Sequence, residues 1–121
     1  MKLIDTKAHG AIDYALGIFL LCVPYMLSLG EPSPKINIFY LVGTALILYS
    51  TLTKYDLGLL SLIPLPLHNI FDVISGLALA ASPWLFGFSD EVYIPHIVFG
   101  FALFMLPIIT NSKKNDTTLI N

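Results

Sequence analysis

The chain has 121 residues, of which 56% are hydrophobic and only 12% are charged, and its formal net charge is −2. An ordinary soluble domain has about a quarter of its residues charged, and a soluble domain this small has too much surface to bury so much apolar mass. The composition therefore predicts an integral membrane protein. All six basic residues are lysine, which argues against a bidentate phosphate clamp, and they form no basic patch for nucleic acid. With one cysteine, Cys22, the chain has no internal disulfide.

Four apolar segments are separated by polar or proline-containing stretches, and we expect each to be a membrane-spanning helix. They run over about 9–29, 36–53, 68–88 and 96–110, with a longer connection over 54–67 and a polar tail over 111–121. A helix needs about 20 residues to cross a bilayer, so the fourth segment is short. The runs lack the alternation of strands. Lysines before the first segment resemble a signal peptide, but the repeat described next begins at His9, so we expect no cleavage.

One spaced pattern occurs twice in the same register. It consists of His, Asp four residues later, Gly four residues after that, and Pro after a further seven. The two copies are His9, Asp13, Gly17 and Pro24, and then His68, Asp72, Gly76 and Pro83. Such a match indicates an internal repeat.

The second and fourth segments correspond more weakly, through Gly43 with Thr53 and Gly100 with Thr110. The repeating unit is therefore a helical hairpin, over about 8–53 and again over about 67–110, within a single membrane domain covering 1–121. Two crossings return the chain to its starting side, so the repeat is of the parallel kind. We expect an all-α protein of four transmembrane helices arranged as two tandem hairpins.

The lysines predict the orientation of the chain in the inner (plasma) membrane. Five lie on the side of the termini and of the middle connection, whereas Lys35 alone lies on the other side. Because short cytoplasmic segments are enriched in Lys, both termini are expected in the cytoplasm.

Residues four apart share one face of a helix, so His9 can contact Asp13, and His68 can contact Asp72. One interpretation is structural: each pair, at the first turn of its helix, clamps the helix end. The other is functional: two imidazoles and two carboxylates form a proton relay or a cation site, and these four residues are our candidate metal ligands. Gly17 and Gly76 continue the same stripe, which predicts that the first and third helices cross there with both pairs facing the bundle interior.

The prolines and the remaining polar residues are expected to have structural roles. Pro24 and Pro83 are expected to kink their helices or end them. We expect His96 to be solvated or to cap its helix, and Thr53 and Thr110 to bond to backbone carbonyls. Asp56 is either solvated or part of a polar cluster with the His–Asp pairs.

The stretch 81–88, Ala-Ser-Pro-Trp-Leu-Phe-Gly-Phe, resembles the SPW-repeat family of small bacterial membrane proteins, named for a motif represented here by Ser82, Pro83 and Trp84. The likeness covers nearly the whole chain, although Val23-Pro24-Tyr25 replaces the motif in the first repeat. The resemblance implies a four-helix integral membrane protein and supplies no reaction, substrate or cofactor.

The sequence contains no nucleophile–base arrangement and no phosphate-binding loop, so we expect neither an enzyme nor a bound cofactor. The function that it favours is that of a structural or accessory membrane protein, surrounded by lipid, which associates with itself or with a membrane partner. The alternative is a proton- or cation-handling protein that uses the paired His-Asp motifs at the cytoplasmic side.

Overall fold

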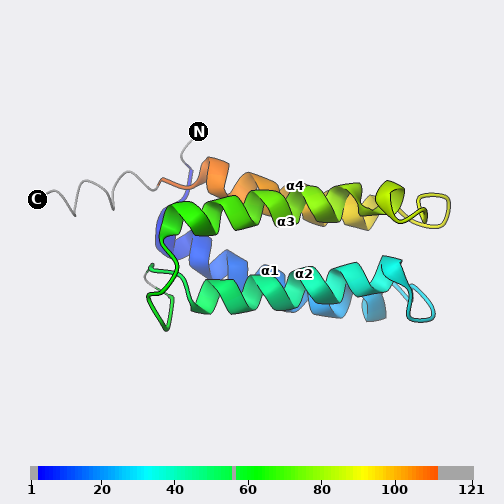
Figure 1. Cartoon of the computed structure of the whole chain (residues 1–121), viewed down its shortest axis with the longest axis horizontal. Helices are drawn as coiled ribbons and strands as arrows, with labels where there is room; N and C mark the ends of the chain where they lie inside the picture. Colours follow the sequence, from blue (N-terminus) through cyan, green and yellow to red (C-terminus); the bar gives the residue numbers. More distant parts are fainter. Residues whose placement is uncertain (1–2, 56, 112–121) are drawn as a thin grey trace, which may run out of the picture.

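The computed structural model describes residues 3–55 and 57–111, and these residues form four antiparallel helices (Figure 1). The helices are α1 (Thr6–Met26), α2 (Pro34–Thr51), α3 (Leu65–Leu85) and α4 (Ile94–Ile109). The hairpin α1–α2 lies against the hairpin α3–α4, with the two hairpin turns at one end and the termini and the 52–64 connection at the other. Apart from two isolated bridges, the described residues contain no strand, so the all-helical prediction and the two hairpins are confirmed.

Each helix begins two or three residues before the predicted start. Proline occupies one of the first two positions of α2, α3 and α4, where its missing N–H has no helical partner in any case. Pro34, Pro66 and Pro95, at the ends of the stretches that separate the predicted segments, therefore lie in the first turns of these helices. Helix α1 starts after Asp5, whose carboxylate accepts the Ala8 amide at 2.8 Å. As a result, His9 is the fourth residue of its helix, one turn deeper than the first-turn position we expected.

The glycines bring helices together inside each hairpin. A Cβ atom built on Gly76 would lie 2.6 Å from the carbonyl oxygen of Gly100, and one on Gly43 would lie 2.9 Å from that of Gly17. Glycine thus permits α1 to pack on α2 and α3 on α4 at backbone contact distance. The predicted crossing of the first and third helices at Gly17 and Gly76 is wrong, because these glycines face the partner helix within their own hairpin.

The two hairpins are joined to each other by matching backbone hydrogen bonds at the end that carries the termini. After α2, the amide of Ile63 bonds to the carbonyl of Leu52 at 2.8 Å, within the covalent connection to α3. After α4, the amide of Ile4 bonds to the carbonyl of Ile109 at 3.2 Å, although these two residues lie near opposite ends of the polypeptide. The start of α1 therefore lies beside the end of α4 as the start of α3 lies beside the end of α2.

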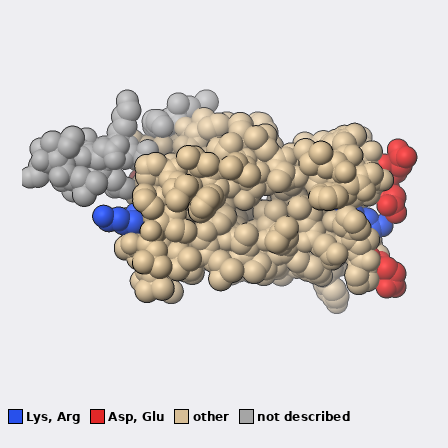
Figure 2. All heavy atoms as spheres, viewed as in Figure 1, with Lys and Arg blue, Asp and Glu red and all other residues tan. Residues whose placement is uncertain are grey.

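The outer surface between the two ends is apolar. Lysine, aspartate and glutamate side chains gather at the ends of the molecule and leave the side seen in Figure 2 free of charge. Large hydrophobic side chains are exposed on every helix, among them Ile18, Leu41, Ile74 and Phe101. Helices α1 and α3 are long and apolar enough to cross a membrane, whereas α4 is apolar but shorter.

Candidate polar site in the bundle interior

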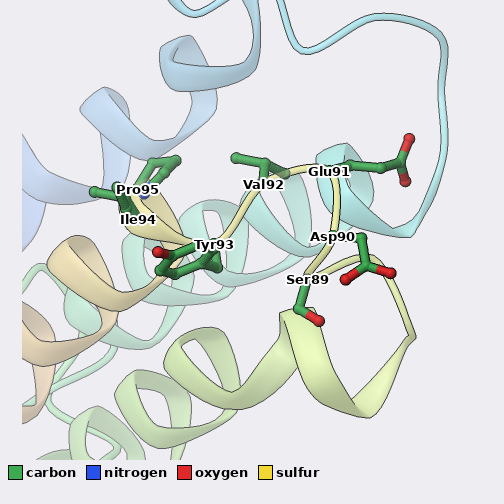
Figure 3. A pocket seen from close by; sticks show the side chains of 7 residues that line it. All are labelled: Ser89, Asp90, Glu91, Val92, Tyr93, Ile94 and Pro95. Atoms are coloured by element: carbon green, nitrogen blue, oxygen red, sulfur yellow. The ribbon is translucent and has the colours of Figure 1, made fainter.

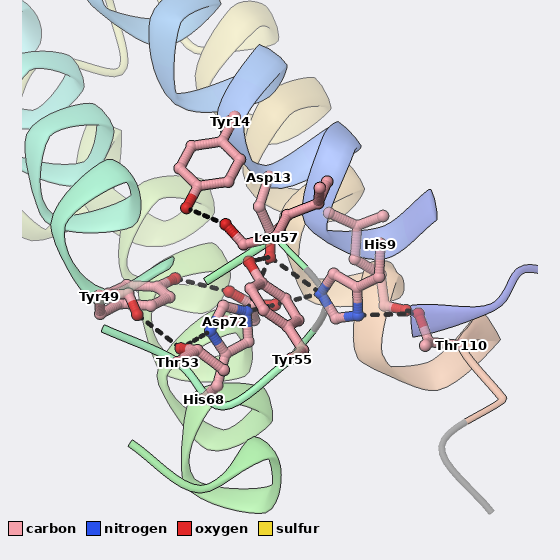
Figure 4. A network of polar contacts seen from close by, with 11 residues as sticks. His9, Asp13, Tyr14, Tyr49, Thr53, Tyr55, Leu57, His68, Asp72 and Thr110 are labelled. Atoms are coloured by element: carbon pink, nitrogen blue, oxygen red, sulfur yellow. Dashed lines mark hydrogen bonds and ion pairs between the residues drawn. The ribbon is translucent and has the colours of Figure 1, made fainter. Parts of the chain in front are cut away.

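The two His–Asp pairs meet inside the bundle, near the end that carries the termini (Figure 4). All four side chains are fully buried, at 0% exposure. Each imidazole Nε2 contacts the Oδ2 atoms of both carboxylates. The four residues therefore form a closed ring of alternating nitrogen and oxygen atoms, called here the His–Asp ring: His9, Asp72, His68 and Asp13. This confirms that both pairs face the bundle interior.

The shorter contacts of the ring run between the two repeats. His9 Nε2 lies 2.8 Å from Asp72 Oδ2, and His68 Nε2 lies 2.7 Å from Asp13 Oδ2. The contacts within one helix, predicted from the four-residue spacing, are both 3.2 Å. The ring is therefore primarily a link between α1 and α3, and only secondarily a clamp within each helix.

Two threonines fix the outer nitrogen of each imidazole. Thr53 Oγ1 lies 2.7 Å from His68 Nδ1, and Thr110 Oγ1 lies 2.9 Å from His9 Nδ1. Each hydroxyl also bonds to the carbonyl four residues earlier, as predicted from the sequence. A carbonyl can only accept, so the single hydroxyl proton points there and the hydroxyl accepts from Nδ1–H. Both imidazoles therefore carry a proton on Nδ1 and present Nε2 to the ring.

Tyrosines bond to the carboxylates from α2 and from the connection. The Tyr49 hydroxyl donates to Asp72 Oδ1 at 2.6 Å, and the Tyr55 hydroxyl donates to Asp13 Oδ2 at 3.3 Å. Burial raises the pKa of Tyr55, so its hydroxyl keeps the donated proton. Tyr14 ties the connection to α1 by donating to the carbonyl of Leu57 at 2.8 Å. Asp56 lies outside the described residues, so its predicted place in this cluster is not assessed.

The hydrogen bonds that the ring receives depart from two-fold symmetry. Thr53 and Thr110 occupy equivalent positions, and four residues before them lie Tyr49 on α2 and Leu106 on α4. Leucine has no hydroxyl to match that of Tyr49. Asp13 Oδ1 is buried and has no hydrogen-bond partner among the described residues, whereas Asp72 Oδ1 has one.

The ring has two ways to satisfy its inward-facing atoms. Bare Nε2 atoms facing ionised carboxylates would place lone pairs against lone pairs, so positive charge has to lie between them. Two protons, one for each nitrogen–oxygen pair, make the ring formally neutral. One divalent cation bound to two neutral imidazoles and two carboxylates gives the same formal charge.

The third histidine differs from the prediction. His96 is fully buried near the opposite end of the bundle, where its Nε2 donates to the carbonyl of Lys35 at 2.9 Å. Its ring packs against Phe39 at a centroid distance of 4.4 Å and against Phe88 at 4.9 Å. These aromatic neighbours exclude water, so the expected solvated or capping role is wrong.

The Ser-Pro-Trp motif lies at the same end as His96, away from the ring. The Ser82 hydroxyl donates to the carbonyl of Leu79 at 2.7 Å, and Pro83 lies in the last turn of α3. Trp84 is exposed and packs beside Tyr93. A nearby pocket in the α3–α4 loop is lined by residues 89–95 (Figure 3), and its carboxylates point outward.

A family model described as the SPW repeat domain matches residues 7–110. The chain belongs to the SPW repeat family. Comparison with curated proteins and with solved structures gave no match. In this SPW repeat protein, both copies of the His-x-x-x-Asp pattern lie within the matched residues and form the ring.

Sequence reasoning identified all four ring residues of this SPW repeat protein but missed their partners. The threonines were assigned only to backbone carbonyls, and Tyr49 and Tyr55 were not predicted to contact the ring. Both threonines follow a glycine by ten residues, a repeated spacing that marks them as equivalent. The two tyrosines have no counterpart in the other repeat, so the sequence held no comparable signal for them.

Proposed function

We propose that this chain is a multi-pass inner-membrane protein whose four helices all span the bilayer, with both termini in the cytoplasm. The charge-free side and the exposed apolar residues on all four helices support this placement. At about 1.5 Å per residue, the 16 residues of α4 cover roughly 24 Å of a hydrocarbon core of about 30 Å. Residues flanking this helix would have to cover the difference.

Within this placement, we propose that the protein handles a cation, a proton or a metal ion, at the His–Asp ring. The observation that carries the proposal is the meeting of two imidazoles and two carboxylates, all fully buried, from two repeats. Ionisable groups inside a membrane bundle are expensive to bury and commonly mark ion or proton sites. No reaction is assigned to the ring, so the proposed function is not enzymatic.

A structural or accessory role is the second candidate, and the complete burial of the ring favours it. All four side chains are shielded from solvent in the described chain, and the ring joins the two repeats. In this candidate function the ring only holds the hairpins together, and the protein acts by contact with another copy or with a membrane partner. The glycines give that contact no support, because they are used within the hairpins.

Thermal unfolding in detergent separates the two functions. The wild type is compared with the double variant His9→Ala/His68→Ala, across pH and with added divalent cations, and His96→Ala serves as a buried-histidine control outside the ring. The groups that face the histidine pair are Asp13, Asp72, Tyr49 and Tyr55, with the hydroxyls of Thr53 and Thr110. Cation handling predicts a pH- or metal-dependent midpoint that persists in the His96 variant and disappears in the double variant, because a ligand stabilises the state that binds it. A midpoint that is independent of pH and of metal in the wild type refutes it and leaves the structural role.

A further inference from the structure

We infer that the His–Asp ring binds one first-row divalent transition-metal ion per chain, through His9 Nε2, His68 Nε2 and the carboxylates of Asp13 and Asp72. The inference rests on the proposed cation-handling function and narrows it to a ligand class. All four donor atoms lie within 4.8 Å of one another.

The size of the ring fits such an ion. With metal–ligand bonds of about 2.0–2.2 Å, neighbouring donors of a tetrahedral site lie about 3.3–3.6 Å apart. The four nitrogen–oxygen distances in the ring are 2.7, 2.8, 3.2 and 3.2 Å. Expansion of each edge by roughly 0.1–0.9 Å would therefore bring these four nitrogen–oxygen pairs to the spacing of such a site.

The donor set selects the class of metal. Magnesium and calcium favour six or more oxygen ligands, and Mg²⁺ retains several of its waters, whereas the ring offers two nitrogens in a closed interior. The ring contains no thiolate, so it does not favour the softest ions. Two imidazoles and two carboxylates suit Zn²⁺ and neighbouring first-row ions.

The histidines already have the orientation that metal ligation requires. Because Thr53 and Thr110 hold Nδ1–H of the two rings, both Nε2 lone pairs are free to bind once their protons leave. Donation of the second ring nitrogen to a fixed oxygen is the usual support of a metal-bound histidine. The threonines are therefore positioning residues.

The unpartnered oxygen is the second, independent observation. Asp13 Oδ1 is fully buried and no described donor satisfies it, whereas Tyr49 satisfies the equivalent atom of Asp72. A buried carboxylate oxygen without a partner loses its hydration and gains no hydrogen bond in exchange, which destabilises the folded chain. A metal ion held by both oxygens of Asp13 removes that destabilisation. The geometry thus assigns two-oxygen binding to Asp13 and one-oxygen binding to Asp72, so that Asp13 Oδ1 adds a fifth donor to the four atoms of the ring.

Charge balance sets the stoichiometry of the exchange. The metal-free ring holds two protons, one for each nitrogen–oxygen pair, and is formally neutral. Binding of M²⁺ forms bonds to the two Nε2 atoms and to the carboxylates, and it releases both protons to solvent. The ring is neutral before and after the exchange, so no uncompensated charge is left in the membrane interior.

The test is native mass spectrometry of the full chain released from lipid nanodiscs with Zn²⁺ or Mg²⁺ as the probe, alongside calorimetry in buffers of different ionisation enthalpy. We expect one Zn²⁺ per chain, no retained Mg²⁺, and about two protons released per Zn²⁺. Asp13→Asn/Asp72→Asn should abolish Zn²⁺ retention, and His96→Asn should leave it unchanged. Thr53→Val should weaken Zn²⁺ affinity roughly 10–100-fold, and Thr53→Ser, which keeps the hydroxyl, should restore it.

Failure of this inference differs from failure of the proposed function. A folded wild type that retains no Zn²⁺, yet unfolds with a pH-dependent midpoint that His9→Ala/His68→Ala removes, overturns the metal site and leaves proton handling in place. Zn²⁺ retained equally by the Asp13→Asn/Asp72→Asn variant places the ion elsewhere and also overturns the site. A wild type that shows no response to Zn²⁺, Mg²⁺ or pH overturns both. The comparison of Zn²⁺ retention with Mg²⁺ retention uses the wild type alone. Misfolding of a variant therefore does not decide the result.

Discussion

Removal of the Tyr49 hydroxyl tests whether the ring contributes to stability through its hydrogen bonds. In Tyr49→Phe, Asp72 Oδ1 loses a 2.6 Å bond in a fully buried site, while the aromatic ring keeps its packing against Phe71 and His68. A hydrogen bond to a charged group contributes about 1.5–3 kcal/mol, and the largest interhelical bonds measured in a membrane protein reach about 1.7 kcal/mol. The ranges overlap near 1.5 kcal/mol, which is the loss of unfolding free energy that we expect.

Tyr55→Phe is the matched control. Its bond to Asp13 Oδ2 is 3.3 Å long and the side chain is only partly buried, so water can replace the hydroxyl. The expected loss is no more than the membrane average of about 0.6 kcal/mol. The assay is equilibrium unfolding in mixed micelles, followed by circular dichroism. A loss for Tyr49→Phe equal to or smaller than that for Tyr55→Phe would refute the conclusion that the bond to Asp72 is the stronger of the two.

Three further predictions concern packing, orientation and chain closure. The substitution Gly76→Ala gains about 1 kcal/mol of helix propensity, but its Cβ meets backbone atoms of Gly100 and Phe104 at 2.6 Å. Such overpacking costs about 1–3 kcal/mol, so the variant should be less stable than the wild type. The same unfolding assay should show a smaller loss for Gly17→Ala, whose nearest neighbour is a side chain that can move. Thr110→Val should reduce any pH or metal dependence of the thermal midpoint that the wild type shows, whereas Thr110→Ser should retain it in full. The same dependence in the two variants would contradict the positioning role. A circular permutant can be made by joining residue 111 to residue 3 through a short linker and opening the chain between residues 59 and 60. It should keep the helical circular dichroism spectrum, because backbone bonds already hold residues 3 and 4 beside the end of α4. Loss of the helical spectrum would contradict this closure.

The sequence was sufficient for the helices and for the members of the ring, because both depend on short-range patterns. Apolar runs of helical length predicted the hairpins, and the repeated His-Asp spacing placed His9 and Asp13 on one helix face. Which carboxylate each histidine prefers was not visible. That preference depends on how two hairpins, each fixed by its own glycine contacts, present α1 to α3 across the bundle.

The errors in the sequence interpretation have local physical causes. Proline was interpreted as a boundary before the third helix, although the first turn of a helix tolerates it, and this placed His68 one turn too shallow. His96 was treated as exposed because it begins a helix. It is buried because Phe39, at the corresponding place on α2, and Phe88 pack on its ring. Such contacts between distant segments leave no periodic trace in the sequence.

The difference between Tyr49 and Leu106 has a consequence for why the two hairpins share one polypeptide. Two identical hairpins that associated as a dimer would surround both carboxylates in the same way. Only one polypeptide, whose halves can differ, can bond one carboxylate through Oδ1 and the other through Oδ2. The two unequal halves therefore give this bundle chemically distinct aspartates on an otherwise two-fold frame, and of the two only Asp13 has an oxygen without a described partner. An ion bound between them would have a defined orientation that a dimer of identical hairpins cannot encode.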